Sequence, residues 1–377
     1  MVSSSDRRLR ILALWGASHF DDFFTQCYLQ NPKYDFEIVS GDRTSGPSPH
    51  AASWGRLLDL RRRLKRGEFD LVLSGNIQNT AWPRNKGLPT RLAQGFRYFT
   101  YKHRMLDTYW APWLVRGLKD RVPLAVADTL DPAFIQAKDL PLLRAATLYF
   151  KMNLYYWPRR TLAPLESFFG ARRITPYLPK LRPLSCGVAK SAISAEARPM
   201  RERDIDICFT GSVSPTRAKG DHDPVAALSV NTVRRDVFER VRRLSNRYKV
   251  YCIDHAVPLD EYLELLQRSK LVVCTESFGS ETSRHYNVSG AGAVPLLNWP
   301  YVQNYQQMEP DVHAIYFSLI GDHFERVVTD ALASPEKLER IARAAREFTI
   351  EKKERSKLGD YVIEETMREH ARLQARS

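Results

Sequence analysis

The sequence has few of the features that would tie it to a disulfide framework, a zinc site or a membrane span. Its five cysteines stand singly at positions 27, 186, 208, 252 and 274, with no Cys-x-x-Cys pair. An odd number of isolated cysteines fits neither a disulfide scaffold nor a zinc site. The longest apolar stretch, from Leu140 to Trp157, is interrupted by Arg144 and Lys151, so it cannot cross a bilayer cheaply. We therefore predict a cytoplasmic protein without a transmembrane segment.

Acidic pairs that could hold a metal between phosphates are also scarce. Asp204 and Asp206 form the motif "DID", but this motif begins a predicted strand, where both carboxylates point the same way and face solvent. Arginine side chains and helix N-termini can stabilise a leaving phosphate without a metal. We expect neither a metal nor a cofactor.

Basic residues, by contrast, are in excess, and the formal net charge is +14. Such a charge attracts anions over about a Debye length, so it indicates an anionic partner without identifying its class. A nucleoside diphosphate, a phospholipid surface, an anionic glycan and a nucleic acid all qualify.

The order of apolar runs predicts two α/β domains. The chain has 377 residues, 44% of them hydrophobic, which is enough for two buried cores. Short apolar strands alternate with helical periods in both halves, a pattern typical of doubly wound parallel sheets. We predict a first domain over 1–187, a linker over 188–203 and a second domain over 204–350. A helical segment over 351–377 could pack back on the first domain.

The stretch "ETSRHYNVSGAGAVP", residues 281 to 295, is the most informative motif. In open parallel sheets, ligands bind beyond the carboxyl ends of the strands, where helix N-termini present unpaired N–H groups. Thr282 or Ser283 is a plausible N-cap, which places Arg284 in the first helical turn, where a cation opposes the helix dipole and needs an anion nearby. Arg284 and Asn287 share one helix face. The alternative is an Arg284 that pairs with a surface acid and an Asn287 in solvent.

The segment "SRHYNVSGAGAVPLL" resembles the signature of GT-B fold glycosyltransferases, especially the exostosin-like and spore-maturation-protein-like families of glycosyltransferase group 1. Upstream, "DICFTGSVSPTR" resembles their phosphate loop, and "VPLDEYLELLQRSKLVVCTES" resembles the helix and strand before the signature. The resemblance covers residues 204–350, and the first half matches by architecture alone. It implies two Rossmann-like domains facing a cleft and a hexosyltransferase-like enzyme. Such an enzyme moves a sugar from a nucleoside-diphosphate sugar to a hydroxyl acceptor.

The resemblance also implies roles for individual residues. Arg284 and the loop 211–217 would stabilise the diphosphate leaving group, and Val257 would contact the base through its backbone. Asn287 stands where the family has a Glu for the ribose, and an amide carries no charge, which leaves the stereochemical outcome open. The implied nucleotide-sugar site consists of Gly211, Ser212, Arg217, Val257, Glu281, Thr282, Arg284, Tyr286 and Asn287.

The acceptor half offers two candidate segments. In "WGASHFDDFF", residues 15 to 24, the candidates for the catalytic base or for acceptor binding are His19, Asp21 and Asp22, although Asp21 could simply cap the next helix. Residues 96 to 113 interleave aromatics with basic side chains, which suits an acceptor or a polyanion; the alternative is an amphipathic helix that buries its aromatics. The basic candidates there are Arg97, Lys102 and Arg104.

Two further basic segments leave the partner open. Residues 56 to 66, "RLLDLRRRLKR", have leucines on one helical face, so they could dock on a core or meet a membrane surface or polyanion. The cluster "YYWPRR", residues 155 to 160, suits a membrane or an acceptor. The rival hypotheses are a nucleic-acid binding protein, a DNA-modifying glycosyltransferase and a sugar-binding protein without activity.

Overall fold

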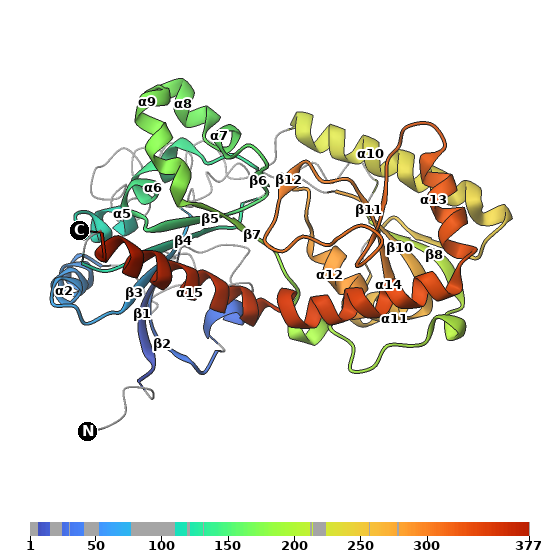
Figure 1. Cartoon of the computed structure of the whole chain (residues 1–377), viewed down its shortest axis with the longest axis horizontal. Helices are drawn as coiled ribbons and strands as arrows, with labels where there is room; N and C mark the ends of the chain where they lie inside the picture. The colour runs from blue at the N-terminus through green and yellow to red at the C-terminus, as the bar shows by residue number, and fades with distance from the viewer. Residues whose placement is uncertain are drawn as a thin grey trace, which may run out of the picture. The chain divides into compact units, whose positions relative to one another are not determined.

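The computed structural model describes residues 7–15, 25–29, 31–40, 53–76, 110–118, 121–130, 132–211, 213, 224–255, 257–276 and 279–376. The chain forms two compact units, Met1–Leu184 with Gly359–Ser377, and Ser185–Leu358. Figure 1 shows that each unit is an α/β arrangement with helices around a sheet.

The described part of the first unit contains a six-stranded sheet in the order β2-β1-β3-β4-β5-β7, with every neighbouring pair parallel. The four central strands of this sheet are apolar runs that are mostly buried on both faces, as parallel sheets require, whereas the two edge strands are partly exposed. Their bounds are β1 (Leu9–Trp15), β2 (Tyr34–Ser40), β3 (Leu71–Gly75), β4 (Leu124–Asp128), β5 (Leu148–Met152) and β7 (Leu181–Leu184).

Helices cover both faces of this sheet. On one face a cluster of buried side chains joins Leu12, Val72 and Val126 to residues of α2, α5 and α6. On the other face α15 packs through Tyr361, whose ring meets Phe150 edge to face at 5.4 Å and whose hydroxyl donates to the Pro183 carbonyl. The helical elements of this unit are η1 (Thr25–Leu29), α2 (Trp54–Lys65), α5 (Trp110–Val115), η3 (Ala137–Asp139), α6 (Leu140–Ala145), α7 (Pro158–Thr161), α8 (Ala163–Phe169), α9 (Ala171–Ile174), η4 (Thr175–Lys180) and α15 (Arg355–Gln374).

Helix α2 shows how the sequence produces these elements. Ser53 caps it by accepting a hydrogen bond from the Arg56 N–H at 3.3 Å. Leu57, Leu60 and Leu64 recur at helical spacing and are buried in the core. The leucine face of the basic segment 56–66 therefore docks on the sheet.

The described part of the second unit contains a five-stranded parallel sheet in the order β13-β11-β10-β8-β9. Its strands are β8 (Ile205–Thr210), β9 (Val250–Ile253), β10 (Ser269–Cys274), β11 (Val294–Asn298) and β13 (Ile315–Phe317). The two-residue strands β6 (Leu154–Tyr155) and β12 (Val302–Gln303) lie outside the two large sheets.

The helical elements of the second unit alternate with its strands. They are η5 (Lys190–Ala192), η6 (Met200–Glu202), α10 (Pro224–Arg243), η8 (Leu244–Asn246), α11 (Leu259–Arg268), α12 (Ser283–Gly290), α13 (His323–Leu332), α14 (Pro335–Phe348) and η9 (Thr349–Lys353). Helix α14 begins with Ser334 as N-cap and Pro335 in its first turn, and it buries Leu338 and Ile341. Both parallel sheets thus confirm the predicted fold class of two Rossmann-like, doubly wound domains.

The segment between the two sheets lies in the second unit and packs against the end of α12. Gly292 has a φ of +74°, and a Cβ there would lie 2.5 Å from the Cβ of Ala197. Gly292 is therefore needed both for its backbone conformation and for this close approach.

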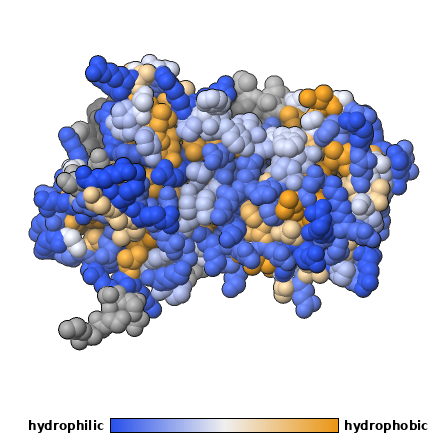
Figure 2. Space-filling view, viewed as in Figure 1, coloured by the Kyte–Doolittle hydropathy of each residue, from blue (hydrophilic) through white to orange (hydrophobic). Residues whose placement is uncertain are grey.

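No helix in the described ranges is long and apolar enough to cross a membrane. On the face drawn in Figure 2, hydrophilic residues predominate and hydrophobic residues form small groups between them.

Candidate functional site

The strand order of the second unit creates a switch point between β8 and β10. From β8 the chain passes through α10 to β9 on one side, and then through α11 to β10 on the other side of β8. In open parallel sheets this reversal leaves a crevice at the carboxyl ends of the two strands, and ligands bind there. The residues that end or follow these strands are therefore the candidates for ligand binding.

Arg284 and Gly211 meet at this switch point. Gly211 directly follows β8, and a Cβ at that position would lie 3.3 Å and 3.4 Å from the two terminal nitrogens of Arg284. Arg284 lies in the first turn of α12, after the N-cap residue Thr282. Because Gly211 has no side chain, the guanidinium can lie directly over the end of β8.

A second arginine, Arg234 of α10, shares this edge of the sheet. Its Nε donates to the carbonyl of Glu276, which follows β10, at 3.2 Å. Burial and, to a lesser extent, the like charge of Arg284 together lower the pKa of Arg234 to about 10. Two guanidinium groups are thus close enough to repel each other.

The described residues do not fully neutralise the charges of Arg284 and Arg234. Arg284 forms no ion pair there, and its Nη1 is buried without a hydrogen-bond partner within the ranges that the structure describes. Burial raises the pKa of Glu276, and only the charge of Arg234 opposes this effect. An anion with several acceptor oxygens would satisfy both guanidinium groups, because Arg presents a fork of donors that matches phosphate.

Unpartnered hydroxyl groups lie on the same edge of the sheet as the arginine pair. They belong to residues at the end of β8, after β10 and before α12, and all are buried and without partners in the described part of the chain: Thr210, Thr275 and Thr282. The N-terminus of α12 adds backbone N–H groups and the positive end of its dipole. The whole edge therefore favours a negatively charged, oxygen-rich ligand.

Asn287 lies one turn after Arg284 on α12 and forms a side-chain hydrogen bond with Tyr262 of α11. Burial raises the pKa of Tyr262 to about 12, while the Arg284 charge opposes that rise. Asn287 is half-buried, so its amide is held by α11 next to the arginine. Its predicted contact with a ribose stays a prediction.

Glu281 and Tyr286 lie in a buried ionic cluster around Lys353. The Glu281 carboxylate accepts from the Cys186 N–H at 2.9 Å and from the Tyr286 hydroxyl, and the Lys353 ammonium lies 3.9 Å away. Lys353 also donates to Ser185 Oγ and to the Tyr305 carbonyl, and it lies over the Tyr286 ring. Burial lowers the pKa of Lys353 to about 8. This cluster holds the loop before α12 in place.

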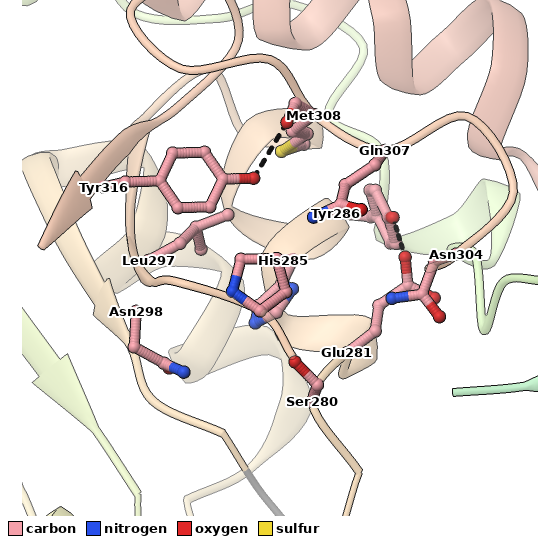
Figure 3. A pocket seen from close by; sticks show the side chains of 11 residues that line it. Ser280, Glu281, His285, Tyr286, Leu297, Asn298, Asn304, Gln307, Met308 and Tyr316 are labelled. Carbon is pink, nitrogen blue, oxygen red and sulfur yellow. Dashed lines mark hydrogen bonds between the residues drawn. The ribbon is translucent and has the colours of Figure 1, made fainter. Parts of the chain in front are cut away.

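A pocket opens at the end of β11, on another side of α12 (Figure 3). His285 lies in the middle of the group, with the Ser280 hydroxyl directed towards its ring. Burial lowers the pKa of His285 to about 3, and the Arg284 charge adds to this effect, so the imidazole is neutral at pH 7. The remaining lining residues are Glu281, Tyr286, Leu297, Asn298, Pro300, Asn304, Gln307, Met308 and Tyr316.

Several residues predicted from the sequence fall outside the described residues: His19, Asp21, Arg97, Lys102, Arg104, Ser212 and Arg217. Val257 is described and lies in the loop after β9, which is the neighbour of β8. The structure therefore brings together Gly211, Arg284 and Asn287, places Glu281 and Tyr286 in the adjacent cluster, and leaves the base contact of Val257 a prediction.

The sequence interpretation missed Arg234, His285, Ser280 and Lys353. Arg234 is one of many arginines on α10, and only the sheet topology distinguishes it from the others. His285 and Ser280 lie in or beside the signature motif, so their position was a usable signal. No sequence signal indicated Lys353, because this residue is far from the motif in sequence.

The described residues contain no group of three or more His, Cys, Asp or Glu side chains that could hold a metal ion. Asp204 and Asp206 lie at the amino end of β8, where they pair with Arg268, Lys249 and Lys270. The "DID" motif is therefore at the opposite end of the strand from the arginine pair.

With this geometry in view, residues 230–356 match the family model described as glycosyl transferase-like. The matched segment includes Arg234, Arg284 and the pocket. The match therefore lies within the second unit, and it agrees with the resemblance inferred from the signature motif. None of the curated proteins matches the chain.

Solved structures with a similar fold extend over nearly the whole chain. One is the Anabaena protein HepE in complex with UDP, at 11% identity over 94% of this chain and 99% of that chain, with a TM-score of 0.49. An alpha-glucosyltransferase in complex with UDP and a 13-mer DNA containing a HMU base has 11% identity, 97% and 100% coverage and a TM-score of 0.48. Sucrose-phosphate synthase from Thermosynechococcus elongatus has 11% identity, 98% and 100% coverage and a TM-score of 0.48. Similarity at this level identifies no reaction, so the function depends on the site and on the family match.

Proposed function

We propose that the protein is a glycosyltransferase that moves a glycosyl group from a nucleoside-diphosphate sugar to a hydroxyl acceptor. The observation that carries this proposal is the Arg284 guanidinium over Gly211 at the switch point, with Arg234 beside it. The described residues do not fully neutralise the positive charge of these two arginines. The glycosyl transferase-like match over residues 230–356 supports the same reaction class.

In the proposed reaction, the bond between the anomeric carbon and the diphosphate oxygen breaks, and the acceptor hydroxyl oxygen forms the new bond to that carbon. Negative charge develops on the departing diphosphate, so fixed cations stabilise the transition state more than the ground state. Arg284 and Arg234 would supply that charge. The acceptor proton would pass to a base, for which His19 and Asp21 remain our candidates.

The test is Arg284→Ala, with Arg326→Ala as its control. Arg326 lies on α13 of the same unit and pairs only with exposed Asp322 within the described ranges. Loss of a cation at a departing diphosphate is typically worth about 2–4 kcal/mol, so we expect sugar-nucleotide turnover to fall by about 30- to 1,000-fold. The readout is hydrolysis or transfer with a panel of sugar nucleotides. Equal turnover in the two variants would remove the assignment.

The nucleic-acid alternative gains no specific support. In α2, the basic helix of the first unit, Arg61 donates to the carbonyls of Trp113, Leu114 and Arg116. Arg63 binds Glu37 and Glu68. These arginines stabilise the unit and are not available to a polyanion. Strong dependence of duplex binding on salt would be the sign that favours this alternative.

We also propose peripheral membrane contact through the segment that contains α7–α9, residues 156–174. Trp157 and Phe168 are each 76% exposed there, which is unusual for such large apolar side chains. The same segment carries the exposed arginines Arg160, Arg172 and Arg173. Aromatic side chains beside arginines suit the interface of an anionic bilayer.

Vesicle sedimentation tests this membrane proposal. The variant Trp157→Ser with Phe168→Ser should lose most binding to vesicles of phosphatidylserine and phosphatidylcholine, whereas Ile320→Ser should not. Ile320 is 83% exposed but lies in the second unit. Identical binding of both variants would contradict the proposal.

The five free cysteines support our proposal of a reducing compartment, the cytoplasm.

A further inference from the structure

The pocket beside α12 has two buried polar atoms that the rest of the described chain leaves without partners. Ser280 is 4% exposed and His285 is 8% exposed, and neither Ser280 Oγ nor His285 Nε2 has a hydrogen-bond partner in the described residues. A buried polar group without a partner typically costs about 1–3 kcal/mol. Two such atoms in one pocket therefore indicate that something else satisfies them.

The size of the pocket limits what that can be. Its cavity volume is about 20 Å³, within a free space of about 310 Å³ that includes open solvent. A cavity of roughly 10–15 Å³ holds one water molecule, so the enclosed space of this pocket admits about one water or one hydroxyl group. A larger group bearing that hydroxyl would lie in the mouth.

The chemistry of the lining favours a neutral ligand. Glu281 is the one charged lining residue, and its carboxylate is already bonded to Cys186, Tyr286 and Lys353. The side chains of Asn298, Asn304 and Gln307 and the ring of Tyr316 line the pocket. Neutral hydrogen-bonding groups and aromatic faces are the combination that binds carbohydrates, because sugars present both hydroxyls and apolar C–H faces.

His285 and Ser280 together suit a hydroxyl group in particular. A neutral imidazole nitrogen either donates or accepts, depending on the tautomer, and the serine hydroxyl does both. A hydroxyl group also donates and accepts, so it can bond to both atoms in either tautomer. An ammonium or a carboxylate would bring an uncompensated charge into this position.

The pocket is linked to the arginine pair through a short chain of contacts. The Asn298 Oδ1 at the pocket accepts from the Glu276 N–H at 2.9 Å, and the Glu276 carbonyl accepts from Arg234. His285 directly follows Arg284 on α12. The pocket and the arginines therefore lie at the same edge of the parallel sheet, where one ligand could contact both.

We propose that this pocket determines donor specificity: Ser280 and His285 bind one hydroxyl group of an uncharged glycosyl residue whose ring lies in the mouth. This inference rests on the proposed function. It goes beyond it by giving the sugar class, neutral and hydroxylated, and by naming two residues that recognise it.

The test separates the diphosphate from the sugar. Calorimetry would compare the wild type with Ser280→Ala and His285→Phe, using UDP, GDP and ADP alone and then UDP-glucose, UDP-galactose, UDP-N-acetylglucosamine, GDP-mannose and ADP-glucose. Ser283→Ala is the matched control, because Ser283 is exposed on the same helix. We expect the affinity for the nucleoside diphosphate to change by less than about twofold, and the affinity for the preferred sugar nucleotide to fall about tenfold in each variant.

Deoxy analogues of the preferred sugar identify the hydroxyl. The wild type should lose about tenfold in affinity with one monodeoxy analogue, and Ser280→Ala should no longer distinguish that analogue from the parent sugar. The His285→Phe variant removes an unpartnered nitrogen and keeps a ring. The free energy of unfolding of this variant should therefore be no lower than that of Ser280→Ala.

The outcomes distinguish the two proposals. If a nucleoside diphosphate binds and needs Arg284, but both pocket variants bind every sugar nucleotide like the wild type, the pocket holds only a water molecule and this inference is wrong. If the wild type binds no nucleoside diphosphate at all, the proposed function is wrong and this inference is wrong with it.

Discussion

The carboxyl ends of the two sheets differ in how their charges are compensated. In the first unit, Asp128 ends β4 and lies next to Lys151 of β5, and the two form an ion pair of 3.2 Å with side chains that are almost completely buried. Tyr149 donates to the same carboxylate at 2.8 Å. In the second unit, Arg284 and Arg234 repel each other, and the described residues supply only Glu276 nearby.

This difference separates structural charges from charges that await a ligand. Lys151 also donates to the Leu130 carbonyl, and the Leu130 N–H donates back to Asp128, so each group of the pair has a partner within its own unit. Such a closed network stabilises the native state and has no free capacity for a substrate. An arginine with a buried, unpartnered nitrogen, by contrast, weakens the free protein until an anion arrives.

The largest expected effect comes from opening the closed network. Asp128→Asn keeps the shape of the side chain but leaves the Lys151 ammonium buried without a counter-charge, so the free energy of unfolding should fall by about 3–5 kcal/mol. Urea unfolding measures this loss. Adding Lys151→Met removes the stranded charge and should recover most of it. If Asp128→Asn alone were as stable as the wild type, the distinction between structural charges and ligand-binding charges would be wrong.

The next effect concerns binding and leaves stability nearly unchanged. Arg234→Gln removes one of two repelling cations, so the free energy of unfolding should stay the same or rise slightly. The affinity for a nucleoside diphosphate should fall by about 10- to 100-fold, because a charge-assisted hydrogen bond is worth about 1.5–3 kcal/mol. Calorimetry and urea unfolding on the same samples check both parts.

A double variant of Arg234 and Arg284 tests whether the two arginines share one anion. If they do, their effects on diphosphate affinity should not be additive, because both lose the same ligand. Additive losses would mean that the two side chains bind separate groups.

A third effect appears only with changing pH, at Lys353. Burial lowers its pKa to about 8 in the native protein, from an ordinary value of 10.5. Between these two values the unfolded chain holds a proton that the native protein has released, so the free energy of unfolding rises with pH. Relative to Lys353→Met, the wild type should gain about 1 kcal/mol between pH 7 and pH 9. Parallel stability curves for the two proteins would show that the ammonium does not titrate there.

The architecture was predictable because it follows from local patterns. Apolar runs such as those of β1 and β10 are buried on both faces, and the leucines of α2 and the apolar residues of α14 recur at helical spacing. Short elements without such a period were not predicted: β7 at Leu181–Leu184 and β13 at Ile315–Phe317 are edge strands formed by pairing with distant segments.

The candidate site was predictable only where it coincided with a motif. Gly211 and Arg284 were named from the sequence, and the structure brings them together. Arg234 could not be chosen, because its role depends on the tertiary contact of the middle of α10 with the loop after β10. Glu281 is engaged by Cys186 and Lys353, from two segments far from it in sequence, so its buried cluster depends on tertiary packing that no local pattern encodes.

The smallest expected effect compares two neighbouring arginines of α2 and applies the same distinction within one helix. Arg63 binds Glu37 at 2.7 Å and Glu68 at 2.9 Å, whereas exposed Arg62, among the described residues, reaches only the Leu58 carbonyl of its own helix. The Glu37 hydrogen bond raises the pKa of Arg63 above its ordinary value. Arg63→Ala should lower the free energy of unfolding by about 0.5–1 kcal/mol, and Arg62→Ala should leave it unchanged within about 0.5 kcal/mol. Raising the salt concentration should shrink the Arg63 effect, because partly exposed ion pairs are screened. Equal effects of the two substitutions would mean that compensation by acids does not determine which arginines of this unit are structural.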